Sequence, residues 1–331
     1  MSRPAILLTA LAALLVLALL GICLGARPIA PGDSLRALFS PDPANDLHLV
    51  VRELRLPRTL IAVMAGAALG MAGALIQAVT RNPLAEPGLL GVNAGAGVAV
   101  IIAVAFLGVK GVTAYVWFAY LGAGAAGALV FFLGRAHTSG AHPLRLVLAG
   151  AGLSVALGSL TGIIVINSPV QVLDDFRNWS AGSVEGRSLQ VAFVLAASLA
   201  AGGLICFTLA RGLNALMLGQ ESGRALGLNP PRIWALACVA VMLLAGGATA
   251  AAGPISFVGL VAPHLARSVG RANYGWILVF SALFGALLLL GADIIGRMIA
   301  APDEVAAGII AMLVGGPFFI WVARRFRMVR A

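Results

Sequence analysis

Long apolar runs are the feature of this sequence that most restricts its fold. Ten of them follow one another along the chain, and most are about 20 residues long. A helix of about 20 residues is long enough to cross the ~30 Å hydrocarbon layer of a bilayer. The sequence therefore predicts an all-α polytopic membrane protein, with about ten transmembrane helices forming a single domain over residues 1–331. The runs cover residues 4–26, 58–80, 92–109, 112–134, 144–166, 189–210, 232–252, 254–268, 276–295 and 305–323.

Composition supports lipid as the solvent of this chain. Apolar residues make up 61% of the 331 residues and charged residues only 10%, whereas a soluble domain carries about a quarter charged residues. The first run follows Arg3 and is open to two interpretations, a signal peptide or a retained helix. Its apolar core exceeds the usual length of about 7–15 residues in a signal peptide, so we expect a retained helix.

The net charge of +10 is best interpreted as a topology signal. The cations are scattered along the chain and form no basic block, so nucleic-acid binding is not expected. With a cytoplasmic N-terminus, the inner side holds 13 cations against two acids, and the outer side nine cations against ten acids. Cytoplasmic loops carry such an excess, so we expect both termini in the cytoplasm. The 13 inner cations are Arg3, Arg81, Arg135, Arg145, Arg211, Arg224, Arg232, Arg267, Arg271, Arg324, Arg325, Arg327 and Arg330.

The sequence shows no arrangement of residues typical of a catalytic or metal site. The three cysteines lie in apolar runs without metal-ligand spacing, and no Walker A motif is present. Asp293 is the one acid inside an apolar run, so no carboxylate relay crosses the membrane. We therefore expect no metal and no cofactor bound by this chain, no enzymatic activity, and an energy source for any active transport in another chain. An intramembrane enzyme acting on a lipid and a passive channel are the alternatives from other classes.

The segment Thr80–Gly91, "TRNPLAEPGLLG", is a polar interruption between two apolar runs. Pro83 and Pro87 cannot lie inside an unbroken helix, and Asn82 and Glu86 would be costly against lipid. The segment is either an ordinary loop or a rigid turn that faces the protein interior and is suited to a gate. A comparable break, "GPISFVGLVAP", follows in the second half and suggests a weak internal repeat.

Three further features each allow a structural and a functional interpretation. The segment 211–231 contains a short amphipathic helix that rests on lipid headgroups or lies in a groove of a cytoplasmic partner. Arginines at the outer ends of two runs either reach toward headgroups or bind an acidic partner; they are Arg52, Arg55, Arg58 and Arg297. Polar residues in the fifth run either pack against another helix or line a water-filled path; they are Ser154, Ser159 and Thr161.

Several motifs, in this order, resemble the FecCD-type permease family of bacterial ABC importers for iron–siderophores, haem and vitamin B12. They are "RLPRTL", "GAALGMAGALIQAVTRNPLAEPGLLGVNAGAG", "GSVEGRS", "LGQESGRALGL", "AAGPISFVGLVAPHLAR" and "GADIIGR". Within the family the chain looks most like permeases for ferric siderophores of the enterobactin type. The resemblance implies a type II ABC importer architecture with ten transmembrane helices per subunit, located in the bacterial inner (cytoplasmic) membrane. It also implies a second permease subunit, identical or paralogous, two cytoplasmic ATPase subunits that bind ATP and Mg²⁺, and a periplasmic or lipid-anchored binding protein.

The resemblance also implies roles for individual residues. Arg55, Arg58 and Arg297 match positions that meet acidic residues of the binding protein, and Asn82, Pro83 and Leu84 match the cytoplasmic gate. The segment 211–231 matches the helices that couple the permease to the ATPase, and the fifth apolar run matches the helix that lines the path. The expected function is inward translocation of a ferric siderophore, with haem or vitamin B12 as alternative cargo. The expected coupling residues are Leu218, Gly219, Glu221, Arg224, Leu226 and Gly227.

Overall fold

Ten long or apolar helices form the body of the protein. The computed structural model describes residues 2–25, 29–134, 143–217 and 220–328, and within these ranges it contains helices and no strands. Each of the ten predicted apolar runs corresponds to one helix, so the prediction of an all-α membrane protein is confirmed. These helices are α1 (Arg3–Cys23), α4 (Leu56–Thr80), α5 (Val92–Leu107), α6 (Val112–Leu133), α7 (Pro143–Ile166), α9 (Leu189–Leu216), α11 (Pro230–Ala252), α12 (Val258–Gly270), α13 (Tyr274–Ile299) and α14 (Ala307–Met328).

Eight of the described helices are long and apolar enough to cross a membrane. The two others are α5, with 16 residues, and α12, with 13 residues. Helix α12 is shorter than the apolar run 254–268 with its flanks would allow, because Gly253 ends α11, Pro254 follows it, and the helix begins only at Val258.

Six shorter elements lie between the long helices, and the sequence analysis predicted only the region of one of them. It found the segment around α10 from its amphipathic pattern, whereas the others are too short or too polar to register as apolar runs. The shorter elements are α2 (Pro31–Phe39), α3 (Asp46–Leu49), the π-helix η1 (Val50–Arg55), the 3₁₀-helix η2 (Pro87–Leu90), α8 (Val170–Ser180) and α10 (Gln220–Ala225).

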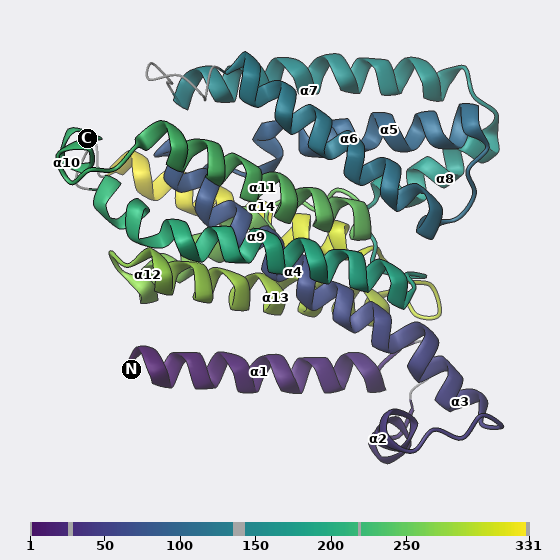
Figure 1. Cartoon of the computed structure of the whole chain (residues 1–331). Helices are drawn as coiled ribbons and strands as arrows, with labels where there is room; N and C mark the ends of the chain where they lie inside the picture. The colour runs from purple at the N-terminus through teal and green to yellow at the C-terminus, as the bar shows by residue number, and fades with distance from the viewer. Residues whose placement is uncertain (1, 26–28, 135–142, 218–219, 329–331) are drawn as a thin grey trace.

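Helix α4 is the centre of the bundle and packs against α13, α11, α12 and α9. Figure 1 shows it between α7 on one edge and α1 on the other. Close contact is possible because α4 carries glycine where its neighbours approach: a Cβ atom at Gly70 would clash with the carbonyl oxygen of Ser281 in α13. Without a hydrophobic drive between helices in lipid, such close packing is a main source of their association.

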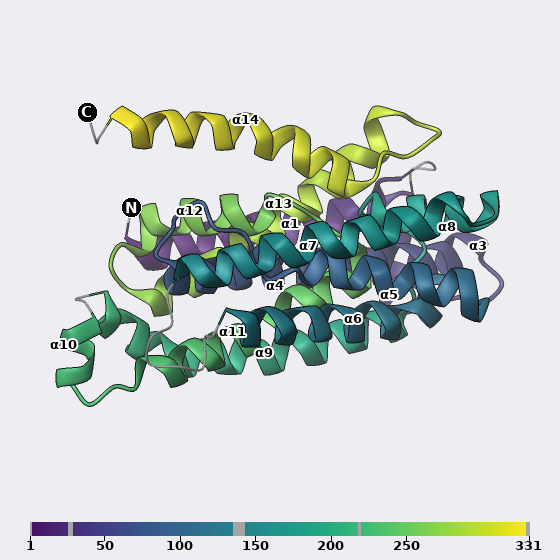
Figure 2. The same ribbon diagram turned by 90° about the horizontal axis from the view of Figure 1, so that it is seen from above.

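The two ends of the bundle carry different connections. The start of α1, the end of α14 and the short helix α10 lie at one end, while α2, α3 and α8 lie at the other (Figure 1). In the perpendicular view, α14 borders one side of the molecule and α9 and α6 the opposite side (Figure 2). We refer to these two ends as the α10 end and the α2 end.

Candidate functional site

The turn between α4 and α5, residues 81–91, is held rigid by hydrogen bonds of its own. Helix α4 ends because Arg81 adopts a left-handed conformation with φ of 51°. The Asn82 side-chain oxygen accepts a hydrogen bond from the Leu84 amide at 3.0 Å, and the Asn82 carbonyl accepts one from the Ala85 amide at 3.1 Å. Gln77, one turn before the end of α4, donates from Nε2 to the Ala85 carbonyl at 3.1 Å. The segment is therefore a compact turn and not an irregular loop.

This turn contacts the second polar break of the chain, immediately before α12. Glu86 Oε1 accepts a hydrogen bond from the backbone amide of Phe257 at 2.7 Å. Phe257 is the N-cap of α12 and has φ of 67°, a conformation uncommon for a bulky side chain. Pro87 lies against Gly259, where an added Cβ would be 2.7 Å from the proline Cδ. The two breaks that the sequence analysis compared thus meet in space and cover each other's backbone, as apolar surroundings require.

The turn also contacts α7. A Cβ atom at Gly150 of α7 would clash with the carbonyl oxygen of Leu89 in η2. Leu153 and Ser154 of α7 lie within van der Waals distance of where a Cβ at Gly91 would be. The turn therefore contacts three helices, namely α4, α7 and the start of α12.

Burial affects the acid of the turn. It raises the pKa of the Glu86 carboxyl above its usual value, and the hydrogen bond from Phe257 opposes this shift without cancelling it. The predicted gate residues occupy the same turn: Asn82 is exposed, and Pro83 and Leu84 are half-buried. Their gate function stays a prediction.

At the α2 end, one carboxylate binds two arginines. Asp293 of α13 accepts a hydrogen bond from Arg58 Nε at 2.9 Å and lies 2.8 Å from Arg58 Nη2. Its second oxygen accepts from Arg297 Nε at 3.0 Å and forms an ion pair with Arg297 Nη2. Arg58 further binds Glu304 through Nη1 at 2.6 Å. We call Arg58, Asp293, Arg297 and Glu304 the arginine–aspartate cluster.

The cluster is completed by the C-terminal end of α1. Arg297 Nη1 donates to the carbonyls of Gly21 at 2.7 Å and Leu24 at 3.2 Å. Arg55 Nη1 donates to the carbonyls of Ile22 at 3.0 Å and Cys23 at 2.7 Å. The last carbonyls of a helix lack intrahelical partners and carry partial negative charge, so they suit guanidinium groups. The cluster therefore fastens α1 to α4 and α13.

These contacts correct the picture of the arginines as exposed charges. Arg55, Arg58 and Arg297 are only 7%, 8% and 3% exposed. They line a pocket of about 340 Å³ together with Glu185 and Glu304. Arg52, one turn before Arg55, is exposed instead. Arg58 and Arg297 can be buried because each finds a counter-ion within the chain. Direct docking of a partner through them stays a prediction.

Asp293 and Glu304 are residues that the sequence analysis did not assign to a site. The spacing of Asp293 and Arg297, four residues apart in one helix, was a readable signal for an ion pair. The link to Arg58 lies 235 residues away in the sequence and had no such signal.

The segment predicted to couple with an ATPase is divided between two helices. Leu213 and Leu216 are buried at the end of α9, while α10 spans only Gln220–Ala225. This corrects the expectation of one short amphipathic helix, because α9 continues to Leu216 and the chain then turns. Glu221, Arg224, Leu226 and Gly227 are exposed at the α10 end. Leu218 and Gly219 lie outside the described residues.

The predicted pathway residues lie on α7, the long helix with the fewest buried residues among the described spans. Ser154 and Thr161 are half-buried and Ser159 is exposed. The Ser159 hydroxyl donates to the Val155 carbonyl at 2.9 Å, and the Thr161 hydroxyl to the Leu157 carbonyl at 3.0 Å. Such bonds satisfy a hydroxyl on any helix, so a lining role stays a prediction.

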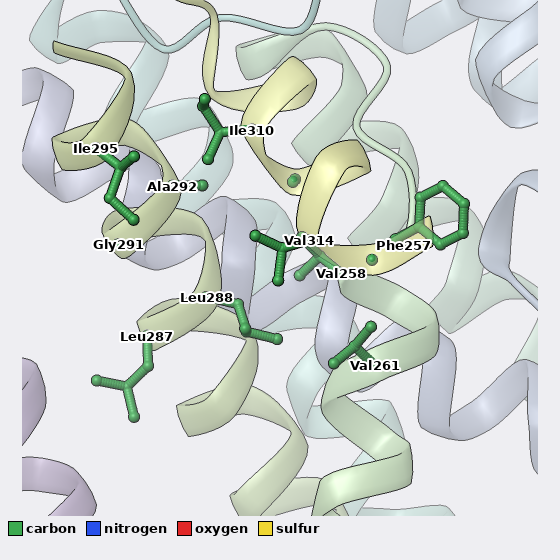
Figure 3. A pocket seen from close by; sticks show the side chains of 12 residues that line it. Phe257, Val258, Val261, Leu287, Leu288, Gly291, Ala292, Ile295, Ile310 and Val314 are labelled. Atoms are coloured by element: carbon green, nitrogen blue, oxygen red, sulfur yellow. The ribbon is translucent and has the colours of Figure 1, made fainter. Parts of the chain in front are cut away.

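A pocket of about 180 Å³ between α12, α13 and α14 is lined by apolar side chains and glycines. Figure 3 shows side chains of the three helices around it, among them Val261, Leu288 and Val314, with Phe257 at one side. Elsewhere among the described residues, no group of three or more His, Cys, Asp or Glu side chains is placed to hold a metal ion.

Comparison with known proteins gives one consistent result. A family model described as the FecCD transport family matches residues 13–325. The chain is 40% identical over 288 residues to the probable siderophore transport system permease protein YfiZ of Bacillus subtilis, covering 87% of this chain and 86% of YfiZ. It is 39% identical over 312 residues to the ferric enterobactin transport system permease protein FepD of Escherichia coli, covering 94% of this chain and 92% of FepD.

A solved structure shows the same fold. It is an inward-facing conformation of a metal-chelate type ABC transporter, with a TM-score of 0.83 and 26% sequence identity. The match covers 97% of this chain and 99% of that one. The similarity thus includes α1 and α14 and is not confined to the central helices.

Proposed function

The chain belongs to the FecCD transport family, and we propose that it carries a ferric siderophore inward across the cytoplasmic membrane as the permease of an ABC importer. The observation that carries this proposal is the similarity to siderophore permeases over almost the whole chain, at 39–40% identity. By name, YfiZ is a probable siderophore transport system permease and FepD a ferric enterobactin transport system permease. The region matched by the family model includes the α4–α5 turn, the arginine–aspartate cluster and α7.

The gate of this importer is proposed to be the α4–α5 turn with Asn82, Pro83 and Leu84. The turn is rigid, and it touches α7 and the start of α12, so a movement of either helix displaces it as a unit. Because interfaces between packed helices have discrete arrangements, a small shift of this kind changes the opening in a stepwise manner.

A second permease subunit, identical or paralogous, is proposed to complete the path. Helix α7 is exposed along its length, and Gly152, Gly158 and Gly162 face open space in the isolated chain. Small residues at such positions allow another helix to approach closely. The polar residues Ser154, Ser159 and Thr161 would then lie near the path between the two subunits.

The energy is proposed to come from two partner ATPase subunits that hold ATP and Mg²⁺. The exposed residues Glu221, Arg224, Leu226 and Gly227, together with Leu218 and Gly219, would meet them at the α10 end. The arginine excess at this end supports a cytoplasmic location for it, together with the start of α1 and the end of α14.

At the opposite end, a periplasmic or lipid-anchored binding protein is proposed to deliver the cargo. Its acidic side chains would approach the pocket lined by Arg55, Arg58 and Arg297, with Arg52 exposed nearby. Charges at such a contact mainly steer the encounter and fix its orientation.

Transport in liposomes tests the proposal. The chain is reconstituted with its ATPase and binding protein, and uptake of a radiolabelled ferric siderophore is followed with ATP, without ATP and with haem as competing cargo. We expect uptake that needs ATP and both partners. Uphill accumulation by the chain alone would contradict the proposed energy source, and uptake of haem but not of ferric siderophore would contradict the proposed cargo.

A further inference from the structure

A second polar pocket, of about 360 Å³, lies beside the α4–α5 turn at the α10 end. It is formed where α4, α9 and α12 end and where α11 and α13 begin. Gln77 comes from α4, Arg81 from the turn that follows it, Trp234 from α11, Arg267 from α12 and Tyr274 from α13. Pro83 of the turn also lines it.

Two buried polar atoms of this pocket lack a partner. Gln77 is 3% exposed, and its Oε1 atom makes no hydrogen bond to any described residue. Since Gln77 Nε2 donates to the Ala85 carbonyl, the free atom is an acceptor. Arg267 Nη1 is likewise buried without a hydrogen-bond partner among the described residues. Buried groups of this kind are costly to leave unsatisfied, but each of these atoms has less than 1 Å² of accessible surface, so the charge of the pocket, and not these atoms, indicates a ligand.

The charge of the pocket selects an anion. Arg81 and Arg267 are its two cations, and its lining among the described residues contains no carboxylate. Arg81 makes one long hydrogen bond, at 3.4 Å, to the Leu216 carbonyl. Arg267 interacts with the Tyr274 hydroxyl, which is neutral when protonated. Neither cation is paired with an acid inside the pocket, in contrast to Arg58 and Arg297 at the other end of the molecule.

The position of the pocket indicates a lipid as the source of the anion. Trp234 and Tyr274 stand at the ends of spans, the depth at which aromatic side chains meet lipid headgroups. Leu213, Leu216 and the exposed Met217 form an apolar side next to the two arginines. Basic pockets between transmembrane helices on the cytoplasmic side are suited to anionic headgroups.

We propose that this pocket binds the headgroup of an anionic phospholipid of the phosphatidylglycerol type. The phosphate oxygens accept hydrogen bonds from Arg267 and Arg81. The bound lipid lies against Pro83 and thereby supports the α4–α5 turn. This inference does not depend on which cargo the protein carries.

Lipid titration of the purified, delipidated full-length chain tests the proposal, with native mass spectrometry as the measurement. Phosphatidylglycerol and phosphatidylcholine with identical acyl chains are compared, because the phosphatidylglycerol headgroup carries a net negative charge and the phosphatidylcholine headgroup is neutral overall. We expect tighter binding of phosphatidylglycerol. Arg267→Gln and Arg81→Asn should each weaken it about fivefold, the value of one cation near an anionic lipid surface.

Matched variants separate this effect from misfolding. Arg232→Gln removes an exposed cation from the same end of the bundle but outside the pocket, and should leave lipid binding unchanged. Arg267→Lys keeps the charge and should restore much of the affinity. Asn at position 81 tolerates the left-handed backbone, so the Arg81→Asn variant should unfold at the same temperature as the unchanged chain.

Three outcomes would overturn the proposal. The first is equal affinity for the two lipids, or unchanged affinity in both pocket variants. The second is displacement of phosphatidylglycerol by inorganic phosphate alone, which would assign the pocket to a soluble anion. The third is weaker association with the ATPase partner in the pocket variants without any loss of lipid, which would assign the pocket to that protein.

Discussion

At the scale of single residues, Asp293 is the acid that pairs with both buried arginines of the arginine–aspartate cluster. It is 1% exposed and satisfies two arginines at once, one from α4 and one from its own helix. The intact ion pairs are weak evidence for a net gain in the free energy of unfolding, since burying the charges is itself costly. Removal of Asp293 is different, because it leaves the buried Arg297 without its carboxylate and Arg58 with Glu304 as its remaining acid.

We expect Asp293→Asn to lower the free energy of unfolding by about 3–5 kcal/mol, the usual effect of breaking a buried ion pair. Thermal unfolding in detergent measures the change. Asp174→Asn is the matched control, because Asp174 pairs with Arg177 on an exposed surface at 3.3 Å and such pairs contribute about 0–1 kcal/mol. Equal effects of the two substitutions would show that the buried cluster has no special role in stability.

Glu86 allows a prediction on pH. Burial raises its pKa in the folded protein above the ordinary value of 4.5, so the folded state holds this proton more tightly than the unfolded state. Stability should therefore fall as the pH rises from 4.5 through the raised pKa. Glu86→Gln keeps the acceptor for the Phe257 amide and removes the charge, so it should abolish this part of the pH dependence.

Glu86→Ala separates the hydrogen bond from the charge. It leaves the Phe257 amide without an acceptor, which costs about 1–3 kcal/mol for a buried group. We expect this variant to be less stable than Glu86→Gln at every pH between about 5 and 8. A Glu86→Gln variant with the same pH profile as the unchanged chain would contradict the assignment of the titration to Glu86.

At the scale of elements, glycine decides how closely α4 approaches its neighbours. Gly66 and Gly70 face backbone atoms of α13, and Gly73 faces the carbonyl of Gly259 in α12. At each position a methyl group has no space, and backbone atoms yield less readily than a flexible side chain. The same residue type on α7 faces open space at Gly152.

This contrast gives a matched pair of substitutions. Gly70→Ala should destabilise the chain by about 1–3 kcal/mol through overpacking. Gly152→Ala should be neutral or stabilising by up to about 1 kcal/mol, since alanine favours a helix over glycine. Unfolding of the monomeric chain in detergent measures both, and a destabilisation by Gly152→Ala equal to that by Gly70→Ala would contradict the packing described for α4 and α7.

At the scale of the whole molecule, the two ends use arginine in different ways. At the α2 end Arg58 and Arg297 are neutralised within the chain, whereas at the α10 end Arg81 and Arg267 face a pocket without an acid among its described residues. A reversal of charge at Arg297 therefore tests folding before it tests docking, because it would place a second carboxylate beside Asp293.

Docking is better tested at Arg52, which is exposed at the α2 end, near the pocket lined by Arg55, Arg58 and Arg297. We expect Arg52→Glu to weaken binding of an acidic binding protein by a factor of about 2–5, the usual value of one exposed charge pair, and to leave thermal stability unchanged. Arg297→Glu should lower stability. Surface plasmon resonance at two salt concentrations measures the binding, and an Arg52→Glu variant whose affinity is unchanged at low salt would argue against electrostatic docking at this surface.

Much of the fold could be predicted because each apolar run is a local signal. A run of about 20 apolar residues has one stable form in lipid, a helix whose backbone hydrogen bonds are satisfied internally. The rigid turn at 81–91 was also local, since Pro83 and Pro87 exclude an unbroken helix. The division of the 211–231 segment and the helices α2 and α8 were missed, because amphipathic or short polar segments leave only weak signals in one sequence.

The sequence by itself determined that the chain consists of membrane helices, where they begin and end to within a few residues, and which segment interrupts them. Only the tertiary structure decided which polar groups meet. Arg58 finds Asp293 across 235 residues, Phe257 finds Glu86 across 171 residues, and Gln77 and Arg267 line one pocket built from five helix ends. The reason is that helix formation depends on neighbouring residues, whereas a buried charge or amide is satisfied by whichever partner the packing of the helices brings within hydrogen-bond distance.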